Sequence, residues 1–549
     1  MFLILNTLWL IRTFKYVLFW LYLWQLKEYH IGRFLDHFKT YKGQKLLFNP
    51  LYSIKALLAL LFVFETKFFT LWLTFLIFIY IAEALIFARQ IYFKAVKKPV
   101  KTSKTLFLAT ISFAIVGIFM FWVLGKTLDA QQPFWLLIFD IATPLVVSFV
   151  VLLFQPFFVL ARNNILKKAA QKIAEFKDLK VIGITGSYGK TSTKEFLTTI
   201  LSEKYKVLST KEHQNSEMGI AKCILESLMP EHEIFVVEMG SYKKGGIKLL
   251  CDIVKPEIGM VVGVNEQHLS LFGSLENLLS AEGGGELAKA LSRYNRGSST
   301  ASPSGPENGL LILNGDNKYC LDLYKKVNNI KKQTYSINRD KINSDIWAED
   351  VAVTKNYVSF MAIDKNREAG HFQVNVLGKQ NVQNLLAAIL VARNLGMDFG
   401  KISEACQNIN AKQAGMILKT EKHGINIIDS SYSANPDGVL ADLDYLNIFD
   451  KKKIIVMPCL IELGSRSAEI HEKIGQKIGK ICDLAVITAK ENFESVKKGA
   501  VYAGMDAKNI IFCENPDDIY SIVTLQSTKG DTVLLEGRVP KKLISLLSE

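Results

Sequence analysis

The stretch KVIGITGSYGKTSTKEFLTTILS at residues 180–202 decides the fold of the larger part of this 549-residue chain. Its opening run of valine and isoleucine predicts a buried strand, and the apolar residues at 196, 197, 200 and 201 share one face of a helix. Between the two lies the glycine-rich turn TGSYGK. A strand, a glycine-rich turn and a helix in this order predict a phosphate-binding loop within an α/β domain whose sheet is mostly parallel.

The turn offers a polyphosphate several favourable groups. Gly186 and Gly189 let backbone N–H groups converge on phosphate oxygens, and the start of the helix adds partial positive charge. Lys190 supplies a full positive charge, and Thr191 offers a hydroxyl to Mg²⁺. A plain structural turn is the alternative, because Ile184 stands where the strict GxxxxGK[ST] pattern has its first glycine. The nucleotide-binding residues that we expect in this turn are Gly186, Ser187, Tyr188, Gly189, Lys190, Thr191 and Ser192.

TGSYGKTST resembles the phosphate loop of the Mur ligase family, the ATP-dependent enzymes that form amide bonds in peptidoglycan precursors. Further similar segments follow in the family's order along the chain. They are HQNSEMGIA (213–221), FVVEMGS (235–241), GVNEQHLSLFGSLEN (263–277), LNGDN (313–317), GKQNVQNLLAA (378–388), IDSSYSANPD (428–437) and IELG (461–464). SYSANP and IELG look most like the subgroup that adds D-alanyl-D-alanine.

The resemblance assigns roles to five residues outside the turn. It implies that Glu238 binds a metal ion, that His268 serves a second ion, and that Asn215 lies near the γ-phosphate. It also implies that Asn381 contacts adenine and that Asp429 faces the nucleotide. The structural alternatives are a loop-facing acid for Glu238, a structural histidine for His268, and a plain helix N-cap for Asn381.

These residues suit the activation of a carboxylate. An amine cannot displace a carboxylate oxygen until phosphoryl transfer from ATP has made an acyl phosphate, and that transfer needs positioning and charge neutralisation. We expect Lys190, Glu238 and His268 to be the catalytic residues, with one Mg²⁺ on Thr191 and Glu238 and a second ion near His268. ATP and Mg²⁺ are therefore the expected cofactors.

One departure from the family pattern concerns the metal site. Mur ligases usually carry a lysine, often carbamylated, shortly after the FGS segment, but this chain has AEGGGEL at 281–287. Counting forward from FGS places Glu282 at the lysine position, whereas counting back from Glu286 places Gly284 there. Because a carbamylated lysine is a long side chain that ends in an acid, we hypothesise that Glu282 supplies the metal-binding charge directly.

Two further departures affect the substrate side of the site. Met416 stands where the family usually has the arginine of a Pro-Gly-Arg sequence, which puts one phosphate-facing cation in doubt. Ser430 and Ser433 stand where the D-alanyl-D-alanine-adding subgroup usually has Asp and Asn. The small soluble domain that grips the UDP-sugar in the family is not recognisable in the chain.

The N-terminal part of the chain predicts a membrane region where the family has its sugar-binding domain. An apolar helix of about 20 residues spans a hydrocarbon core of about 30 Å. Basic residues cluster in loops 27–49 and 89–104 and at the exit 162–172, and positively charged loops stay in the cytoplasm. Five spans with an outside N-terminus therefore put the rest of the chain in the bacterial cytoplasm. The predicted spans are 3–25, 51–64, 68–88, 105–125 and 134–161, the last with Pro144 and Pro156 inside it.

Charge and cysteine content exclude other classes of protein. Residues 1–175 carry 20 Lys/Arg against 7 Asp/Glu, whereas residues 176–549 carry 46 against 45, so we expect no nucleic-acid partner. The seven cysteines contain no CxxC pair, which favours reduced thiols over a zinc ribbon. Glu83 and Asp140 lie within the apolar runs, where they mark a transport path, a lipid-headgroup contact, or structural acids paired between helices.

We therefore predict a helical membrane region at 1–170, a central phosphate-loop ATPase domain of α/β fold at 176–411, and a C-terminal Rossmann-like α/β domain at 412–549. The resemblance implies a multi-pass ligase of the cytoplasmic membrane that joins a D-Ala-D-Ala-like amine to a UDP- or lipid-linked muramoyl-peptide precursor. The alternatives are another membrane-bound amide ligase, such as a poly-γ-glutamate synthetase or a lipid-precursor amidase, and a non-catalytic nucleotide-binding scaffold.

Overall fold

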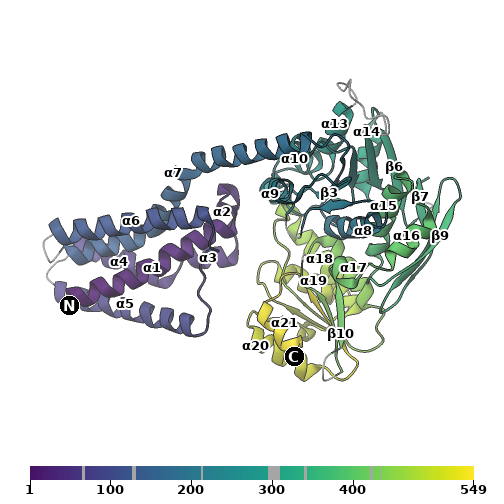
Figure 1. The fold of residues 1–549 in the computed structure, drawn as a ribbon. Helices are drawn as coiled ribbons and strands as arrows, with labels where there is room; N and C mark the ends of the chain where they lie inside the picture. The colour runs from purple at the N-terminus through teal and green to yellow at the C-terminus, as the bar shows by residue number, and fades with distance from the viewer. Residues whose placement is uncertain are drawn as a thin grey trace. The chain divides into compact units, whose positions relative to one another are not determined.

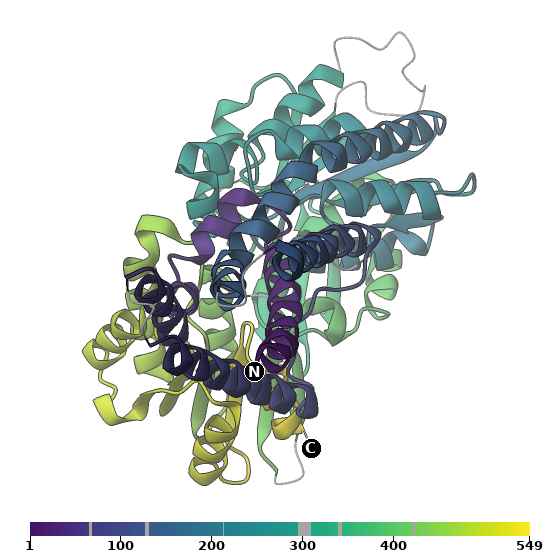
Figure 2. The same ribbon diagram turned by 90° about the vertical axis from the view of Figure 1, so that its left-hand side faces the viewer.

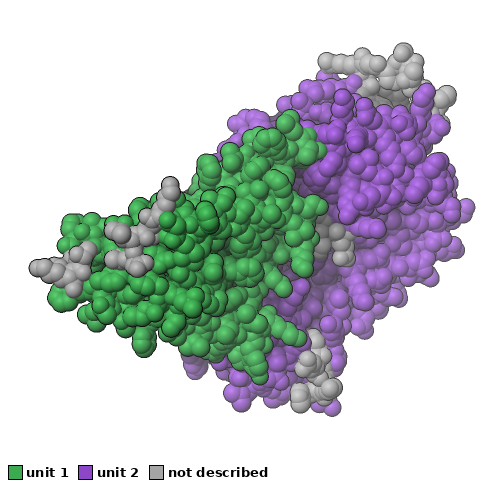
Figure 3. Space-filling view, turned by 60° about the vertical axis from the view of Figure 1, so that its left-hand side comes forward, with its two compact units in different colours: residues 1–162 green, residues 163–549 purple. Residues whose placement is uncertain are grey.

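The computed structural model describes residues 1–64, 68–126, 131–211, 214–294, 309–338, 343–420, 424–432 and 434–548. The chain forms two compact units, residues 1–162 and 163–549, which Figure 3 colours green and purple. The first unit is helical, and the second contains two sheets with helices.

The first unit is a bundle of apolar helices (Figures 1 and 2). Its helices are α1 (Phe2–Leu26), α2 (Ile31–His37), α3 (Tyr41–Leu47), α4 (Pro50–Phe64), α5 (Phe69–Tyr92), α6 (Ser103–Lys126) and the first part of α7 (Gln132–Ala174). Within the described residues, five helical stretches are long and apolar enough to cross a membrane: Phe2–Leu26, Gly43–Phe64, Phe69–Tyr92, Ser103–Gly125 and Gln132–Ala174. Each predicted apolar run is thus helical, and α7 continues through Pro144 and Pro156.

Buried tryptophans join the first helix of this bundle to the last. The Trp9 indole N–H on α1 donates to the carbonyl oxygen of Leu136 on α7 at 2.7 Å. The Trp24 indole N–H donates to Ser148 Oγ at 3.0 Å, and its ring stacks on Phe34 with centroids 3.9 Å apart. Both polar N–H groups are therefore satisfied inside the bundle, as a low-dielectric environment requires.

The larger sheet of the second unit has the order β2-β3-β1-β4-β5-β6-β7-β8-β9. Strands β1 to β7 pair in parallel, and β8 and β9 add an antiparallel edge. The bounds are β1 (Lys180–Thr185), β2 (Val207–Ser209), β3 (Ile234–Glu238), β4 (Ile258–Val261), β5 (Leu310–Asn314), β6 (Lys331–Ser336), β7 (Ile346–Val353), β8 (Val358–Asp364) and β9 (Ala369–Val374). The predicted mostly parallel α/β fold is confirmed.

Helices cover both faces of this sheet because its central strands are apolar on both sides. Ile182 and Ile184 of β1 pack in one core with α8 (Lys190–Ser202), α15 (Gln380–Asn394) and α16 (Phe399–Cys406). Val181 packs in the opposite core. That core also contains α9 (Glu217–Ser227), α10 (Gly246–Val254), α12 (Leu275–Ser280), α13 (Gly285–Tyr294), α14 (Lys318–Lys326) and the end of α7.

The smaller sheet has the order β10-β11-β15-β12-β13-β14 and is parallel except for β10. Its strands are β10 (Ile417–Thr420), β11 (Asn426–Ser430), β12 (Lys453–Met457), β13 (Leu484–Ile487), β14 (Ile510–Phe512) and β15 (Thr532–Glu536). Its helices are α17 (Pro436–Leu446), α18 (Ser467–Ile481), α19 (Phe493–Tyr502), α20 (Pro516–Gln526) and α21 (Lys541–Ser548). Apolar cores lie on both faces, as the predicted Rossmann-like domain requires.

Candidate functional site

The predicted phosphate loop connects β1 to α8 at the carboxyl edge of the large sheet. Gly186 has φ +138°, and a Cβ there would lie 2.8 Å from the carbonyl oxygen of Gly263. That oxygen accepts a hydrogen bond from Ser187 N at 2.6 Å. The loop after β4 therefore holds the phosphate loop by a backbone contact that requires glycine at position 186.

Helix α15 supports the other end of the loop. Gly189 has φ +79°, and a Cβ there would lie 2.6 Å from Asn384 Oδ1. The same amide oxygen accepts from Thr193 Oγ1 at 3.3 Å, and Asn384 Nδ2 donates to Asn381 Oδ1 at 3.1 Å. Sequence reasoning missed Asn384, although it follows Asn381 by three residues and therefore shares its helix face.

Three side chains of the predicted loop have distinct positions. Lys190 Nζ lies over the loop and donates to the carbonyl oxygens of Gly186 at 2.5 Å and Ser187 at 3.3 Å. Ser192 Oγ donates to Ala414 O at 3.4 Å, whereas Thr191 occupies the first turn of α8. The ammonium group is thus held where the loop amides and the helix start would face a phosphate.

The Tyr188 side chain is directed into the protein. A Cβ at Gly263 would lie 2.3 Å from Tyr188 Cζ, so the ring packs directly on that glycine. Asn317 Nδ2 donates to the phenol oxygen at 3.2 Å, and burial raises the pKa of Tyr188. The side chain fixes the loop in place.

Glu238 ends β3 beside Ile184 of β1 and is 4% exposed. Asn215 Nδ2 donates to its Oε1 at 3.0 Å, so the two predicted residues lie together. Lys194 Nζ is 3.8 Å from Oε2 and donates to Thr210 O at 2.7 Å. Sequence reasoning missed this fully buried lysine, although helical spacing from the apolar residues 197 and 201 places it on the buried face of α8.

His268 and Glu282 lie together on the other side of the loop. His268 Nδ1 is 3.3 Å from Glu282 Oε1, and Ser187 Oγ donates to Glu282 Oε2 at 3.3 Å. Glu282 is 1% exposed, whereas Gly284 packs its backbone against Val261. Of the two positions that the sequence left open, the carboxylate of Glu282 is the one that reaches both the loop and His268.

Glu462 of the C-terminal domain lies close to the same histidine. Its Oε2 is 3.6 Å from His268 Nε2, and its carbonyl oxygen accepts from Ser270 N at 3.1 Å. Both Glu462 and His268 have positive φ, +68° and +64°. Non-glycine residues in this region cost free energy and concentrate at functional sites. The IELG segment contained Glu462, but nothing in the sequence paired it with His268.

The oxygen-rich donor set fits Mg²⁺. Within the described part of the chain, no group of three or more His, Cys, Asp or Glu residues is arranged to hold a metal ion by itself. Mg²⁺ commonly binds through one or two carboxylates and takes its other ligands from phosphate oxygens and water. The buried carboxylates of Glu238 and of Glu282, the latter beside His268, are groups of this kind.

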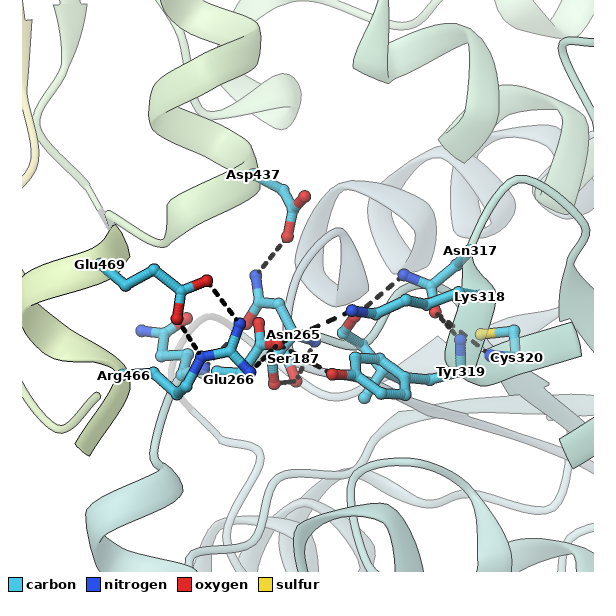
Figure 4. A network of polar contacts seen from close by, with 12 residues as sticks. Ser187, Asn265, Glu266, Asn317, Lys318, Tyr319, Cys320, Asp437, Arg466 and Glu469 are labelled. Atoms are coloured by element: carbon cyan, nitrogen blue, oxygen red, sulfur yellow. Dashed lines mark hydrogen bonds and ion pairs between the residues drawn. The ribbon is translucent and has the colours of Figure 1, made fainter. Parts of the chain in front are cut away.

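The loop after β4 also contacts the C-terminal domain (Figure 4). The buried Asn265 donates through Nδ2 to Asn435 Oδ1 at 3.0 Å and to Asp437 Oδ2 at 2.8 Å, and Figure 4 shows Asp437 directed at it. Burial raises the pKa of Asp437. Arg466 is bonded to Glu469 at 2.7 Å and lies 3.9 Å from Glu266. Sequence reasoning did not single out Asn265 within GVNEQH.

The remaining predicted residues lie along the C-terminal domain and α15. Asn381 is not the N-cap of α15, which is Lys379; it is buried, and its Nδ2 donates to Leu377 O at 2.8 Å. Asp429 lies in β11 and accepts from Ser431 N and Oγ. Met416 is buried in the apolar core, so this position supplies no cation. Ser433 lies outside the described residues.

Ser430 belongs to a buried polar cluster. Its Oγ donates to Asp442 Oδ2 at 2.5 Å, and Gln380 Nε2 of α15 donates to Asp442 Oδ1 at 2.9 Å. Glu536 is buried beside Asp442, and within the described residues no hydrogen-bond donor reaches either of its oxygens. Burial first and the negative charge of Asp442 second raise the pKa of Glu536 well above its usual value, which favours a protonated carboxyl group here.

Family models and solved structures match the second unit. Residues 184–392 match the Mur ligase middle domain, and residues 416–539 match the Mur ligase glutamate ligase domain, together more than half of the chain. The UDP-N-acetylmuramoyl-tripeptide–D-alanyl-D-alanine ligase of Synechocystis sp. is 27% identical over 65% of this chain and 72% of its own. The ligase of that name from Bacillus subtilis is 26% identical over 70% of this chain and 78% of its own.

The fold is that of two solved structures. MurF from Acinetobacter baumannii superposes with a TM-score of 0.59 at 22% identity, covering 71% of this chain and 81% of that one. MurF ligase from Thermotoga maritima in complex with ADP superposes with a TM-score of 0.56 at 24% identity, covering 70% of this chain and 83% of that one.

Proposed function

Because this chain belongs to the Mur ligase family, we propose that it is an ATP-dependent peptide ligase that joins a D-Ala-D-Ala-like amine to the carboxylate of a muramoyl-peptide precursor. The names of its curated relatives support the amine and the acceptor. The observation that carries the proposal is the phosphate loop with Lys190, flanked by two buried carboxylates, Glu238 and Glu282.

The proposed reaction has two steps. A carboxylate oxygen of the precursor attacks the γ-phosphorus of ATP, the bond to the β-phosphate oxygen breaks, and ADP leaves. The amine nitrogen then attacks the carbonyl carbon of the acyl phosphate, phosphate departs, and the nitrogen loses a proton. The protein contributes position and electrostatics to both steps, because the high-energy bond is supplied by ATP.

Different residues around the loop bind the phosphates and the metal ion. Lys190, the loop amides and the start of α8 bind and neutralise the phosphates of the nucleotide. Glu238 and Thr191 would hold Mg²⁺, which when bound supplies further positive charge near the phosphates. Asn215 and Lys194 hold the Glu238 carboxylate at the end of β3.

On the other side of the loop, we propose that Glu282 supplies the negative charge that a carbamylated lysine supplies in other members of the family. Glu282 accepts a hydrogen bond from Ser187 of the loop, and its other carboxylate oxygen lies 3.3 Å from His268 Nδ1. Replacing Glu282 with glutamine keeps the shape and removes the charge. We expect the Mg²⁺ concentration for half-maximal activity to rise at least about ten-fold, because the substitution removes one charge-assisted interaction. The exposed Glu276 provides the matched control, Glu276→Gln, and an unchanged requirement in Glu282→Gln would reject the role.

The C-terminal domain closes the site in this proposal. Asn381 would contact adenine and Asp429 would face the nucleotide, while Glu462 and the Asn265–Asp437 contact hold the second domain against the first. Exclusion of water matters here, because an acyl phosphate is readily hydrolysed.

We further propose that residues 1–162 embed the protein in the cytoplasmic membrane with the second unit in the cytoplasm. The five apolar helices support the spans, and the basic loops support the orientation.

The decisive assay measures ADP release by the full chain in detergent with UDP-linked or lipid-linked tripeptide, each with and without D-Ala-D-Ala. We expect release that depends on both peptide partners and on Mg²⁺. Turnover with glutamate or ammonia instead would identify another amide ligase. Nucleotide binding without any turnover would identify a scaffold and reject the proposed reaction.

A further inference from the structure

The first unit contains a cavity of about 330 Å³ with charged walls. It is lined by residues of α1, α3, α4, α5 and α7, by Asn49 just before α4, and by the segment after α5. Leu46, Asn49 and residues 95–97 are among the lining residues, and these belong to the two basic loops that the charge pattern assigns to the cytoplasmic face. The cavity therefore extends from the cytoplasmic side into the bundle.

Four buried side chains form a closed ion-pair network in its wall. Lys55 Nζ lies 2.6 Å from Glu83 Oε2 and 2.5 Å from Asp140 Oδ2. Arg12 Nε lies 3.1 Å from Glu83 Oε1 and 3.6 Å from Asp140 Oδ1. The two acids that the sequence left open are thus paired between helices. Two cations and two carboxylates balance within the network, so it leaves no net charge.

Two more lysines line the same cavity without such balance. Lys15 is half-buried, and its Nζ lies over the Phe87 ring with 5.4 Å to the centroid. Lys97 lies on the segment after α5. Within the described residues, neither lysine has an acidic partner within 4.0 Å. The residues that line the cavity therefore carry a net charge of two positive. Lys15 is half-buried on α1, where uncompensated charge among membrane helices is expensive, whereas Lys97 is exposed on the segment after α5.

An anionic group of matching charge would balance these lysines. A diphosphate diester carries two negative charges, and its oxygens accept charge-assisted hydrogen bonds from ammonium groups. The hydroxyl of Tyr16 and the amides of Asn49 and Gln90 line the same space and are suited to the polar neighbours of a phosphate. The volume lies at the lower end of the range for small-ligand sites, which fits a head group and leaves no room for a peptide.

We propose that this cavity binds the diphosphate of the acceptor, a group that UDP-linked and lipid-linked precursors share. The assignment rests on the proposed function, because that function makes the acceptor a muramoyl diphosphate compound. Lys15 and Lys97 contact the diphosphate, and the Arg12–Lys55–Glu83–Asp140 network holds the helices that present them.

The test measures direct binding to the full chain in nanodiscs, without ATP, so that its outcome is independent of ligation. The probes are a polyprenyl diphosphate in the nanodisc lipid and a soluble UDP-sugar. The test variant is Lys15→Gln with Lys97→Gln, which leaves the ion-pair network intact. The control is Lys94→Gln with Lys98→Gln, two lysines of the same segment that do not line the cavity.

We expect at least one probe to bind and the test variant to weaken its binding at least about ten-fold for each ammonium group removed, since each group donates charge-assisted hydrogen bonds. The control variant should change binding less than about three-fold, because the two lysine charges that it removes act on the ligand only through solvent, where salt screens them. Preference for the polyprenyl probe would identify a lipid-linked acceptor, and preference for the UDP-sugar a soluble one; either result supports the site.

Three results would overturn the inference: neither probe binds, both double variants weaken binding equally, or turnover with the precursor shows the same KM in the test variant and the parent. Binding that depends on Lys15 and Lys97 in a protein without ligase activity would keep the site and reject the proposed function instead.

Discussion

Lys190 is the one residue of the phosphate loop whose side chain carries a full positive charge. Its ammonium group donates hydrogen bonds to the carbonyl oxygens of Gly186 and Ser187. The loop itself packs against Gly263 and Asn384. A charge that is already in place costs no reorganisation when a phosphoryl group is transferred.

We expect Lys190→Ala to lower the rate of ADP formation by about 10²- to 10³-fold, the usual cost of removing one preorganised electrostatic contact. The control is Lys222→Ala on the exposed face of α9, where the lysine is 61% exposed. The measurement is coupled ADP release at saturating substrates. A Lys190→Ala protein that works as fast as the control would contradict the assigned role.

Lys194 should matter for folding. The side chain is fully buried, with its Nζ 2.9 Å from Glu195 Oε1 and 3.8 Å from Glu238 Oε2, so its removal leaves the buried carboxylate of Glu238 without this cation. Breaking a buried pair in this way costs about 3–5 kcal/mol. We expect Lys194→Met to lower the free energy of unfolding of the detergent-solubilised protein by that amount in a denaturant titration. Lys222→Met serves as the reference, and a decrease below about 1 kcal/mol, the usual value of an exposed pair, would show that Glu238 is satisfied by Asn215 alone.

Sequence reasoning found the residues that follow parallel strands, since the carboxyl ends of such strands meet at one edge. Glu238 was found in this way together with the family resemblance, and His268 was found from that resemblance and its place between two apolar segments. Glu462 was not linked to His268, because their contact depends on how two domains pack and on positive φ at both residues. The side chain of Glu282 was located only by the structure, since a run of three glycines obscured the register.

At the scale of elements, β11, α17 and β15 enclose a carboxyl pair. Ser430, Asp442 and Glu536 come from these three elements, and Gln380 of α15 bonds to the same pair. Folding raises the pKa of Glu536 above 4.5, so the folded protein holds a proton that the unfolded chain releases. Stability contributed by this proton is present at low pH and is lost as pH rises from about 4.5 through the folded pKa.

We expect Glu536→Gln to flatten this pH dependence, because glutamine donates to Asp442 at every pH. In thermal unfolding, the parent protein should lose more of its Tm than the variant between about pH 5 and pH 8. Glu514→Gln, a change at an exposed position, should follow the parent. Parallel Tm curves for the parent and Glu536→Gln would mean that the pair is ionised in the folded protein.

The strands of both sheets were largely predictable, since runs of isoleucine, valine and leucine bounded by turns mark buried strands. Strand β10 was not predicted. It is short, it is half-buried or exposed at every position, and it lies at the antiparallel edge of its sheet. Such a strand depends on its neighbour β11 for pairing and leaves no apolar pattern in the sequence.

At the scale of the whole molecule, the basic loops predict one orientation in the membrane. Residues 1–162 contain no cysteine, and of the seven thiols further along only Cys513 is not buried. A Cys513→Ser background therefore allows single cysteines to report topology.

In that background, we expect Gln131→Cys to react with a membrane-impermeant maleimide in intact cells, because residue 131 precedes α7 on the outer side. Lys98→Cys should react only after the membrane is permeabilised, because it lies in the basic loop before α6. The reverse pattern would place the second unit outside the cytoplasm, where ATP is scarce, and would contradict the proposed reaction.

Charge asymmetry and apolar runs were enough to predict five helices at the front of the chain. They did not predict how Glu83 and Asp140 are used, because a buried acid in an apolar run looks the same whether it binds a ligand or pairs with a neighbouring helix. The cation partners, Arg12 and Lys55, lie 71 and 28 residues from Glu83 in the sequence, and only packing brings them together.

The first two turns of α15 contact both the phosphate loop and the buried carboxyl pair. Asn384 contacts the phosphate loop, while Gln380 donates to Asp442 of the buried carboxyl pair in the C-terminal domain. Linked equilibria are reciprocal: any change that nucleotide makes in the proton affinity of that pair must be matched by an equal effect of acidity on nucleotide affinity. Calorimetric heats of ADP binding, compared between buffers of different ionisation enthalpy, count those protons directly.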